Sequence, residues 1–152
     1  MTILGLPLHV LMVHAVVVLV PLAAVGGLAI SILGWARKRY GSLVLVGAFG
    51  AAVCTYIAQE AGETFQRSFD RPTPTMLKHF AIGGDLFVFV VLLFVGIVAV
   101  QLGQRLVDRD QARGRLLRLV GTVVTIVCAV ISIVQVVRIG HSGAVAVWGG
   151  LA

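Results

Sequence analysis

Residues 7–35 read PLHVLMVHAVVVLVPLAAVGGLAISILGW, an apolar run that contains two histidines, His9 and His14. The first charged residue of the chain is Arg37. A helix needs about 20 mainly apolar residues to cross the hydrocarbon core of a bilayer, so this run predicts a transmembrane helix. We do not expect a cleaved signal peptide, because the run is too long, has no charged region before it and ends in a basic cluster.

The rest of the chain has the same apolar character. Of the 152 residues, 59% are hydrophobic and 12% are charged, and the mean hydropathy is +1.06; a soluble domain has about 25% charged residues. Apolar windows at about 7–35, 42–63, 74–104 and 116–138 predict four spans. We therefore expect an all-α fold, a four-helix transmembrane bundle that forms a single integral membrane domain over residues 1–152.

The positive charges predict how the bundle is oriented. The net charge of +6 does not indicate a nucleic-acid partner, because the basic residues lie in the predicted loops. The first and third loops carry or flank eight of them, namely Arg37, Lys38, Arg39, Arg105, Arg109, Arg113, Arg115 and Arg118. The opposite side has Arg67, Arg71, Lys78 and Arg138. The positive-inside rule then predicts that both termini are outside, in the inner (cytoplasmic) cell membrane.

All four histidines fall in the predicted outer half of the bundle, and they come from three helices: His9, His14, His79 and His141. From the helical rise, His14 lies about 10 Å from Pro7, and His79 lies about 7.5 Å from Pro74. His14 and His79 are therefore the expected facing pair. His9 and His141 would form a second, shallower pair or assist the first.

Two imidazoles on facing helices are a ligand set for haem iron. The small residues of 42–63, together with Gly83 and Gly84, would supply the flat slot that a porphyrin needs. Arg138 is the expected partner of the propionates, with Lys78, Arg67 and Arg71 at the same level. No C-x-x-C-H motif occurs, so the haem would be haem b rather than covalently attached.

Other interpretations of the same residues remain open. The histidines with Glu63 or Glu60 could ligate zinc or copper, or they could seal the outer mouth of the bundle by hydrogen bonds. Asp85 is expected near the bilayer centre, either as a functional acid or as a bond between helices through Tyr56 or Thr55. No H-E-x-x-H motif or Ser/His/Asp arrangement indicates a hydrolase, so whether the protein is an enzyme stays open.

The chain resembles a known family over nearly its whole length. The residues that show the resemblance are H-V-L-M-V-H at 9–14, the lone His79 and G-H-S-G at 140–143. They are similar to a bacterial four-helix integral-membrane domain family of unknown function, whose first helix typically reads H-P-x-x-V-H-F-P. Here Val10 replaces the first proline, and Ala15 and Val16 replace Phe-Pro. Some members of that family are fused to Rieske-type or cytochrome c-type domains, so the resemblance implies a redox setting.

We therefore expect a membrane protein like a b-type cytochrome, which binds haem near the outer face and transfers electrons between a quinone or respiratory complex and an outer acceptor. Its redox partner would be a separate protein, since no redox domain is fused to the chain. A homodimer is the default oligomer. The competing hypothesis is a non-catalytic accessory or assembly subunit of a respiratory membrane complex.

Overall fold

The computed structural model describes residues 2–3, 6–67, 70–71 and 73–148. Two short strands, β1 (Thr2–Ile3) and β2 (Leu6–Pro7), pair antiparallel ahead of the helices. Four long helices follow in the described part of the chain: α1 (Leu8–Ile32), α2 (Gly34–Gln66), α3 (Pro74–Val107) and α4 (Arg113–Trp148). Each contains a segment that is long and apolar enough to cross a membrane, which confirms the expected four-helix membrane fold.

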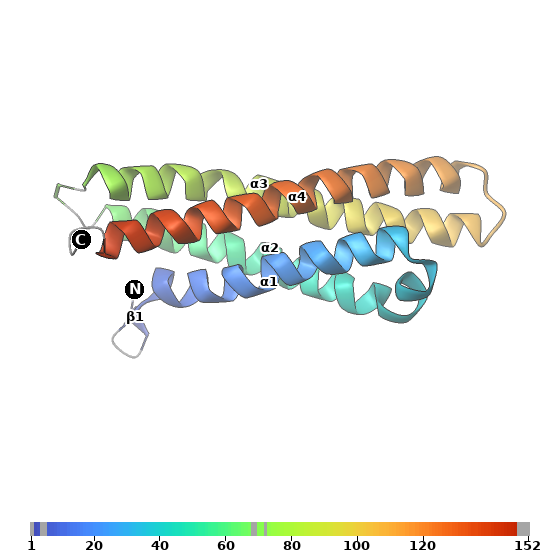
Figure 1. The fold of residues 1–152 in the computed structure, drawn as a ribbon. Coiled ribbons are helices and arrows are strands. Elements are labelled where there is room, and N and C mark those ends of the chain that lie inside the picture. The colour runs from blue at the N-terminus through green and yellow to red at the C-terminus, as the bar shows by residue number, and fades with distance from the viewer. Residues whose placement is uncertain (1, 4–5, 68–69, 72, 149–152) are drawn as a thin grey trace.

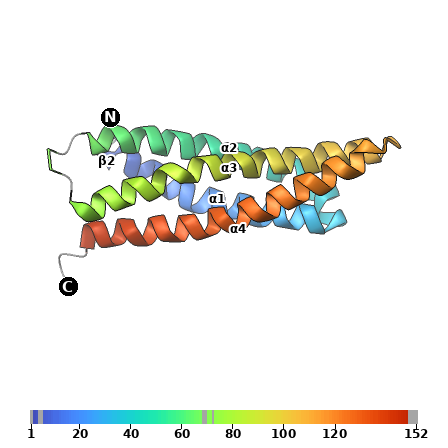
Figure 2. The same cartoon turned by 90° about the horizontal axis from the view of Figure 1, so that it is seen from above.

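The helices form an up-down-up-down bundle (Figure 1). The α3–α4 and α1–α2 pairs have the most extensive contacts, and α1–α4 and α2–α3 contacts close the ring. Seen from above, all four helices run along the length of the molecule (Figure 2). The start of α1 and the end of α4 lie at one end, where the α2–α3 connection also lies (Figure 1). The histidines of three different helices are thereby brought to one end of the bundle.

Helices α2, α3 and α4 are longer than the sequence indicated, whereas α1 ends earlier than expected, at Ile32 rather than Trp35. Only Leu33 separates α1 from α2, and its amide donates to Ala29 O at 2.8 Å. Arg37, Lys38 and Arg39 therefore lie in the first turns of α2, which corrects their expected placement in a loop. At the other end, α4 continues past the expected end at residue 138, through G-H-S-G and as far as Trp148.

Glycines determine how closely α3 and α4 pack. A Cβ atom added to Gly103 would lie 2.5 Å from the amide nitrogen of Arg118 on α4, and one added to Gly121 would lie 2.7 Å from that of Val100 on α3. Gly96 and Gly114 meet the opposite helix in the same way. Because hydrocarbon surrounds the bundle, close packing rather than exclusion of water has to hold such helices together. The four glycines make that packing possible.

Candidate functional site

The N-terminal ends of α1 and α3 bring His9 and His79 together. Their ring centroids are 6.3 Å apart and the ring planes meet at 81°. Phe80 of α3 has its ring centroid 6.4 Å from that of His9 and 5.8 Å from that of His79. On the α2 side, the ring of Phe65 stacks on His9 with centroids 6.1 Å apart. Two imidazoles and two phenyl rings from three helices thus form one cluster, the aromatic cluster.

Hydrogen bonds determine the tautomer of both imidazoles. His9 Nδ1 lies 3.0 Å from Ala58 O, and a carbonyl oxygen only accepts, so Nδ1 carries the hydrogen. His79 Nδ1 lies 3.0 Å from Ser142 Oγ. The Ser142 hydroxyl donates to Ile139 O at 3.0 Å, so its oxygen accepts from His79 Nδ1. In each neutral ring this leaves Nε2 as the unprotonated nitrogen, the form in which histidine binds a metal.

Each imidazole also packs against a glycine of a neighbouring helix. A Cβ atom added to Gly62 of α2 would lie 3.0 Å from Cε1 and Nδ1 of His9. One added to Gly143 of α4 would lie 3.1 Å from Cε1 of His79. Any larger residue at these positions would push against the ring. The two glycines therefore leave room for the rings where the oxygen acceptors hold them.

A cavity of about 640 Å³ lies beside the aromatic cluster and is lined by residues of all four helices. Its volume falls in the range of about 300–1,000 Å³ that is typical of small-molecule and cofactor sites. Much of the lining is apolar, and includes Val13, Val16, Ala58, Leu86 and Val136; the polar residues besides the histidines are Thr55, Gln59, Glu63, Gln66 and Arg67. Gln59 Oε1 is buried and has no hydrogen-bond partner among the described residues, as expected of a group that a ligand or water would satisfy.

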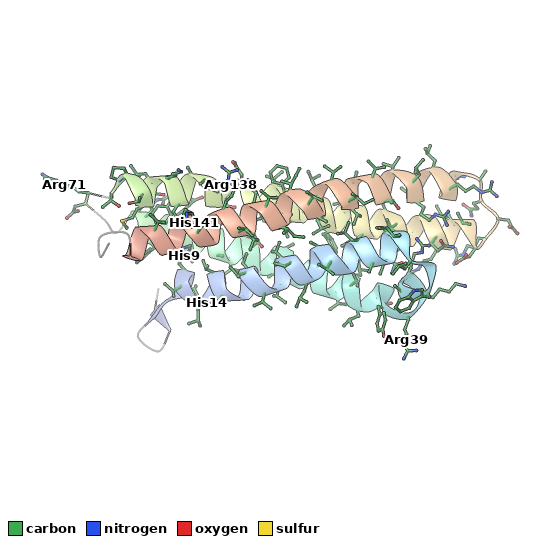
Figure 3. All side chains as sticks on the ribbon, in the orientation of Figure 1. His9, His14, Arg39, Arg71, Arg138 and His141 are labelled. Carbon is green, nitrogen blue, oxygen red and sulfur yellow. The ribbon has the colours of Figure 1, made fainter. Side chains whose placement is uncertain are left out.

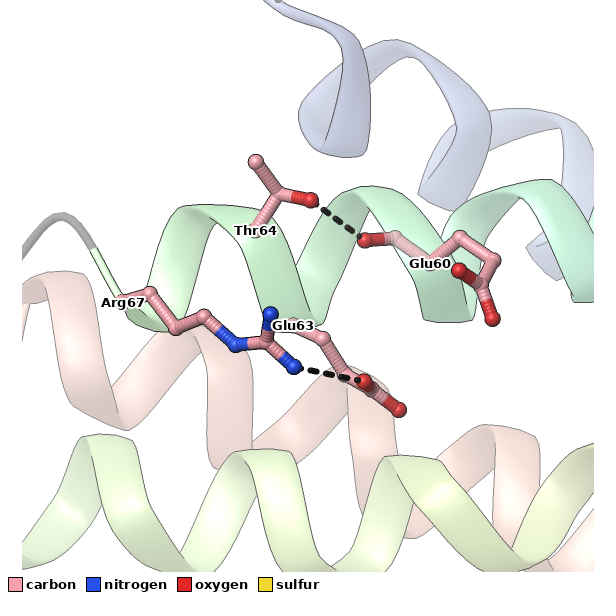
Figure 4. A network of polar contacts seen from close by, with 4 residues as sticks. All are labelled: Glu60, Glu63, Thr64 and Arg67. Atoms are coloured by element: carbon pink, nitrogen blue, oxygen red, sulfur yellow. Dashed lines mark hydrogen bonds and ion pairs between the residues drawn. The ribbon is translucent and has the colours of Figure 1, made fainter.

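The polar side of the cavity comes from the last turns of α2 (Figure 4). Arg67 Nη2 lies 3.6 Å from Glu63 Oε2, and both side chains are largely exposed. Thr64 Oγ1 donates to Glu60 O at 3.0 Å. An exposed ion pair of this kind contributes little stability, so Arg67 can exchange its partner for a ligand carboxylate at little cost.

The neighbour of His79 is His9 rather than His14. Helical rise placed His14 level with His79, but five residues on an α-helix turn a side chain about 140° further round the axis. His14 is exposed, does not line the cavity and bonds through Nδ1 to Val10 O at 2.6 Å. His141 is also exposed on α4. Figure 3 shows His14 further toward the outside of the bundle than His9.

Two other residues named from sequence lie away from the cavity. Arg138 is exposed, and its Nη1 lies 3.5 Å from Gln135 Oε1 on the same helix. Among the described residues, the basic side chain that lines the cavity besides the histidines is that of Arg67. Asp85 is exposed on α3. The suggested bond from Asp85 to Thr55 is not formed, because the Thr55 hydroxyl donates to Ala51 O at 2.7 Å.

Residues that orient the imidazoles escaped the sequence reasoning. Ser142 and Gly143 lie beside His141 in the quoted G-H-S-G motif, of which only the histidine was considered as a candidate. Gly62 is one of the small residues of 42–63 that were expected to form a slot, but its contact with His9 was not foreseen. Nothing in the sequence singles out Gln59, which lines the cavity. Within the described residues, no group of three or more His, Cys, Asp or Glu side chains is placed to hold a metal ion.

Comparison with curated proteins and with solved structures finds no significant match to the chain. A family model does match, over residues 5–150, nearly the whole length. Its description, a predicted membrane protein, agrees with the four apolar helices. The chain therefore belongs to the DUF2231 family of membrane proteins.

Proposed function

We propose that this membrane protein binds haem b between His9 and His79 and serves as an electron-transfer protein. The observation that carries the proposal is the pair of imidazoles that line one cavity, each with Nδ1–H held by an oxygen acceptor. An acceptor behind the ring of a metal-binding histidine orients it and raises the basicity of the ligating nitrogen. A histidine that only closes the end of the bundle by hydrogen bonds would not need a second histidine beside it in the wall of a cavity.

The residues around the two imidazoles suit this group. A porphyrin needs an apolar slot, and valine, alanine and leucine side chains from the four helices supply much of the lining. Its carboxylates need a cation at a polar edge, where Arg67 lies with Gln66. Gln59 brings an unsatisfied amide oxygen to the same wall. Arg67 therefore takes the role that the sequence assigned to Arg138.

Bound haem b would supply reversible one-electron transfer. In the chain itself, His9 and His79 would hold the group, the apolar lining would exclude water, and Ala58 and Ser142 orient the two rings. Because the site lies in one half of a bilayer about 30 Å thick, electrons would be exchanged on that side only. We infer an outer-side redox partner or a quinone in the cytoplasmic membrane, based on the loop charges.

Absorption spectroscopy of the detergent-purified protein from haem-replete cells tests the proposal. We expect a Soret band and a sharp α-band after dithionite reduction, as for six-coordinate b haem. His9→Ala and His79→Ala should each abolish the low-spin spectrum. His14→Ala and His141→Ala are the matched controls and should leave it intact.

Each contrary result has a separate meaning. Loss of the spectrum in His14→Ala, with His9→Ala unaffected, would restore the pair expected from sequence. Bound zinc or copper that is lost in Glu63→Gln would replace haem by a non-haem metal. A colourless, metal-free preparation would overturn both cofactors and favour the accessory-subunit hypothesis.

A further inference from the structure

Two opposite charges lie on the surface of the bundle, a few residues in sequence from groups that form or support the aromatic cluster. Asp85 of α3 and Arg138 of α4 are both exposed. Neither forms an ion pair within 4.0 Å in the described part of the chain, in contrast to Arg67, which pairs with Glu63. In Figure 3, Arg138 lies on the side of the bundle away from His14. We call Asp85 and Arg138 the unpaired charges, although most other charged side chains of the described residues also have no ion pair.

The unpaired charges lie at nearly the same depth. The hydrogen bond between His79 and Ser142 shows that these two residues of α3 and α4 lie at the same depth. The contact of Gly96 with Thr125 gives the same alignment of the two helices further along. Asp85 is six residues after His79, and Arg138 is four residues before Ser142. At 1.5 Å per residue, the difference in depth is about 3 Å. An acid and a base therefore share one level on two adjacent helices.

This level borders the charge-free, apolar part of both helices, nearer the end of the bundle than the mid-bilayer depth expected for Asp85 from helical rise. Asp85 immediately precedes the charge-free run 86–104, and Arg138 immediately follows the charge-free run 119–137. Charged side chains that face lipid are costly and usually pair with one another or face a polar space. With both side chains exposed and unpaired in a single chain, a partner surface that supplies one charge of each sign would stabilise them.

We propose that the unpaired charges form the interface of a homodimer, in which Asp85 of each copy pairs with Arg138 of the other. A two-fold axis makes any patch meet itself, so residue i contacts j and j contacts i. A patch with one acid and one base at one level is complementary to its own copy, and the two reciprocal pairs leave no net charge. The side chains near Asp85 are also small enough for a second helix to approach, because Ala81 and Gly84 are exposed and a Cβ atom added to Gly84 meets no described residue within 4 Å.

Disulfide cross-linking in membranes tests this dimer. In a background with Cys54→Ala and Cys128→Ala, a chain with Asp85→Cys and one tag is co-expressed with a chain that carries Arg138→Cys and a second tag. In the mixed dimer one reciprocal ion pair is replaced by two thiols, while the other ion pair remains. Mild oxidation should give a cross-linked product with both tags. In the control, the chain with Arg138→Cys is co-expressed with a chain that carries Val46→Cys, at an exposed position on α2. No cross-linked product with both tags should form.

A single chain with both Asp85→Cys and Arg138→Cys distinguishes the competing arrangement. An intrachain disulfide, with no cross-linking between chains, would overturn the dimer and show that the charges pair within one copy. Absence of any disulfide would also overturn it. Dimer dissociation gives a second measurement: Asp85→Arg should weaken association about tenfold or more, and Asp85→Arg/Arg138→Asp should restore it. Neither result depends on bound haem, so the outcome is separate from that of the proposed function.

Discussion

At the scale of single residues, one oxygen acceptor orients each imidazole of the aromatic cluster. The carbonyl of Ala58 holds His9, and the Ser142 hydroxyl, which itself donates to Ile139 O, holds His79. Gly62 and Gly143 leave the space that the rings occupy. Acceptor and glycine act on the same ring from neighbouring helices, so small changes in either should alter the site without unfolding the bundle.

Ser142→Ala should weaken haem binding by about tenfold, because loss of a partner behind a ligating histidine costs about 10–100-fold in affinity. His79 Nδ1–H would lose its acceptor, and the ring could rotate. Haem titration of the apoprotein measures the change. Ser142→Thr keeps the hydroxyl and should retain most of the affinity, whereas equal weakening by Thr and Ala would contradict a role for the hydrogen bond.

Gly62→Ala should displace the His9 ring, since the new methyl group would lie 3.0 Å from Cε1 and Nδ1. Gly143→Ala should displace His79 in the same manner. We expect each variant to convert part of the low-spin spectrum to high-spin, as an axial ligand moves away. Gly50→Ala is the matched control, because an added Cβ there meets nothing within 4 Å. A low-spin spectrum that is unchanged in both Gly62→Ala and Gly143→Ala would show that these glycines do not contribute to the site.

At the scale of elements, the α3–α4 pair is the most extensive contact of the bundle. Gly96 and Gly103 recur seven residues apart on α3, and Gly114 and Gly121 do so on α4. Seven residues are almost two turns, so each pair lies on one side of its helix. Backbone atoms of the two helices then approach where side chains would keep them apart. This seam holds α4, and with it Ser142, against α3.

Gly121→Ala should destabilise the bundle by about 1–3 kcal/mol, the usual cost of inserting an atom into close packing. The added Cβ would lie 2.7 Å from the amide nitrogen of Val100. Thermal unfolding in detergent measures the effect. Gly47→Ala has open space around its added Cβ and should be neutral or slightly stabilising, because alanine has the higher helix propensity. Equal melting temperatures for the two variants would contradict the packing role of Gly121.

At the scale of the whole molecule, the basic first turns of α2 and the α3–α4 connection with its flanking arginines lie at the end of the bundle opposite the aromatic cluster (Figure 1). The positive-inside rule then predicts that the cluster lies on the outer side of the membrane. Any exchange of electrons with a soluble partner would take place there. The proposed dimer would join two such sites through α3 and α4, with both facing the same side.

Impermeant maleimide labelling of intact cells measures this orientation. In the cysteine-free background, Asp70→Cys in the α2–α3 connection should react, and Gln111→Cys in the α3–α4 connection should react only after lysis. Both positions are exposed, so access to the thiol does not differ for other reasons. The reverse pattern would move the aromatic cluster to the cytoplasmic side.

Sequence alone determined the fold class, because four apolar runs of sufficient length leave few arrangements in a bilayer, where every backbone group must be bonded internally. It also identified the end of the bundle where the histidines gather and the start of α3, where Thr73 Oγ1 caps Met76 N at 3.3 Å. Only the tertiary structure decided which histidines meet. In a membrane protein apolar residues face both the core and the lipid, so Val20, which is fully buried, and Leu22, which is 64% exposed, look alike in sequence. Hydrophobic periodicity therefore does not reveal how each helix is rotated, and rotation is what brings His9, rather than His14, to His79.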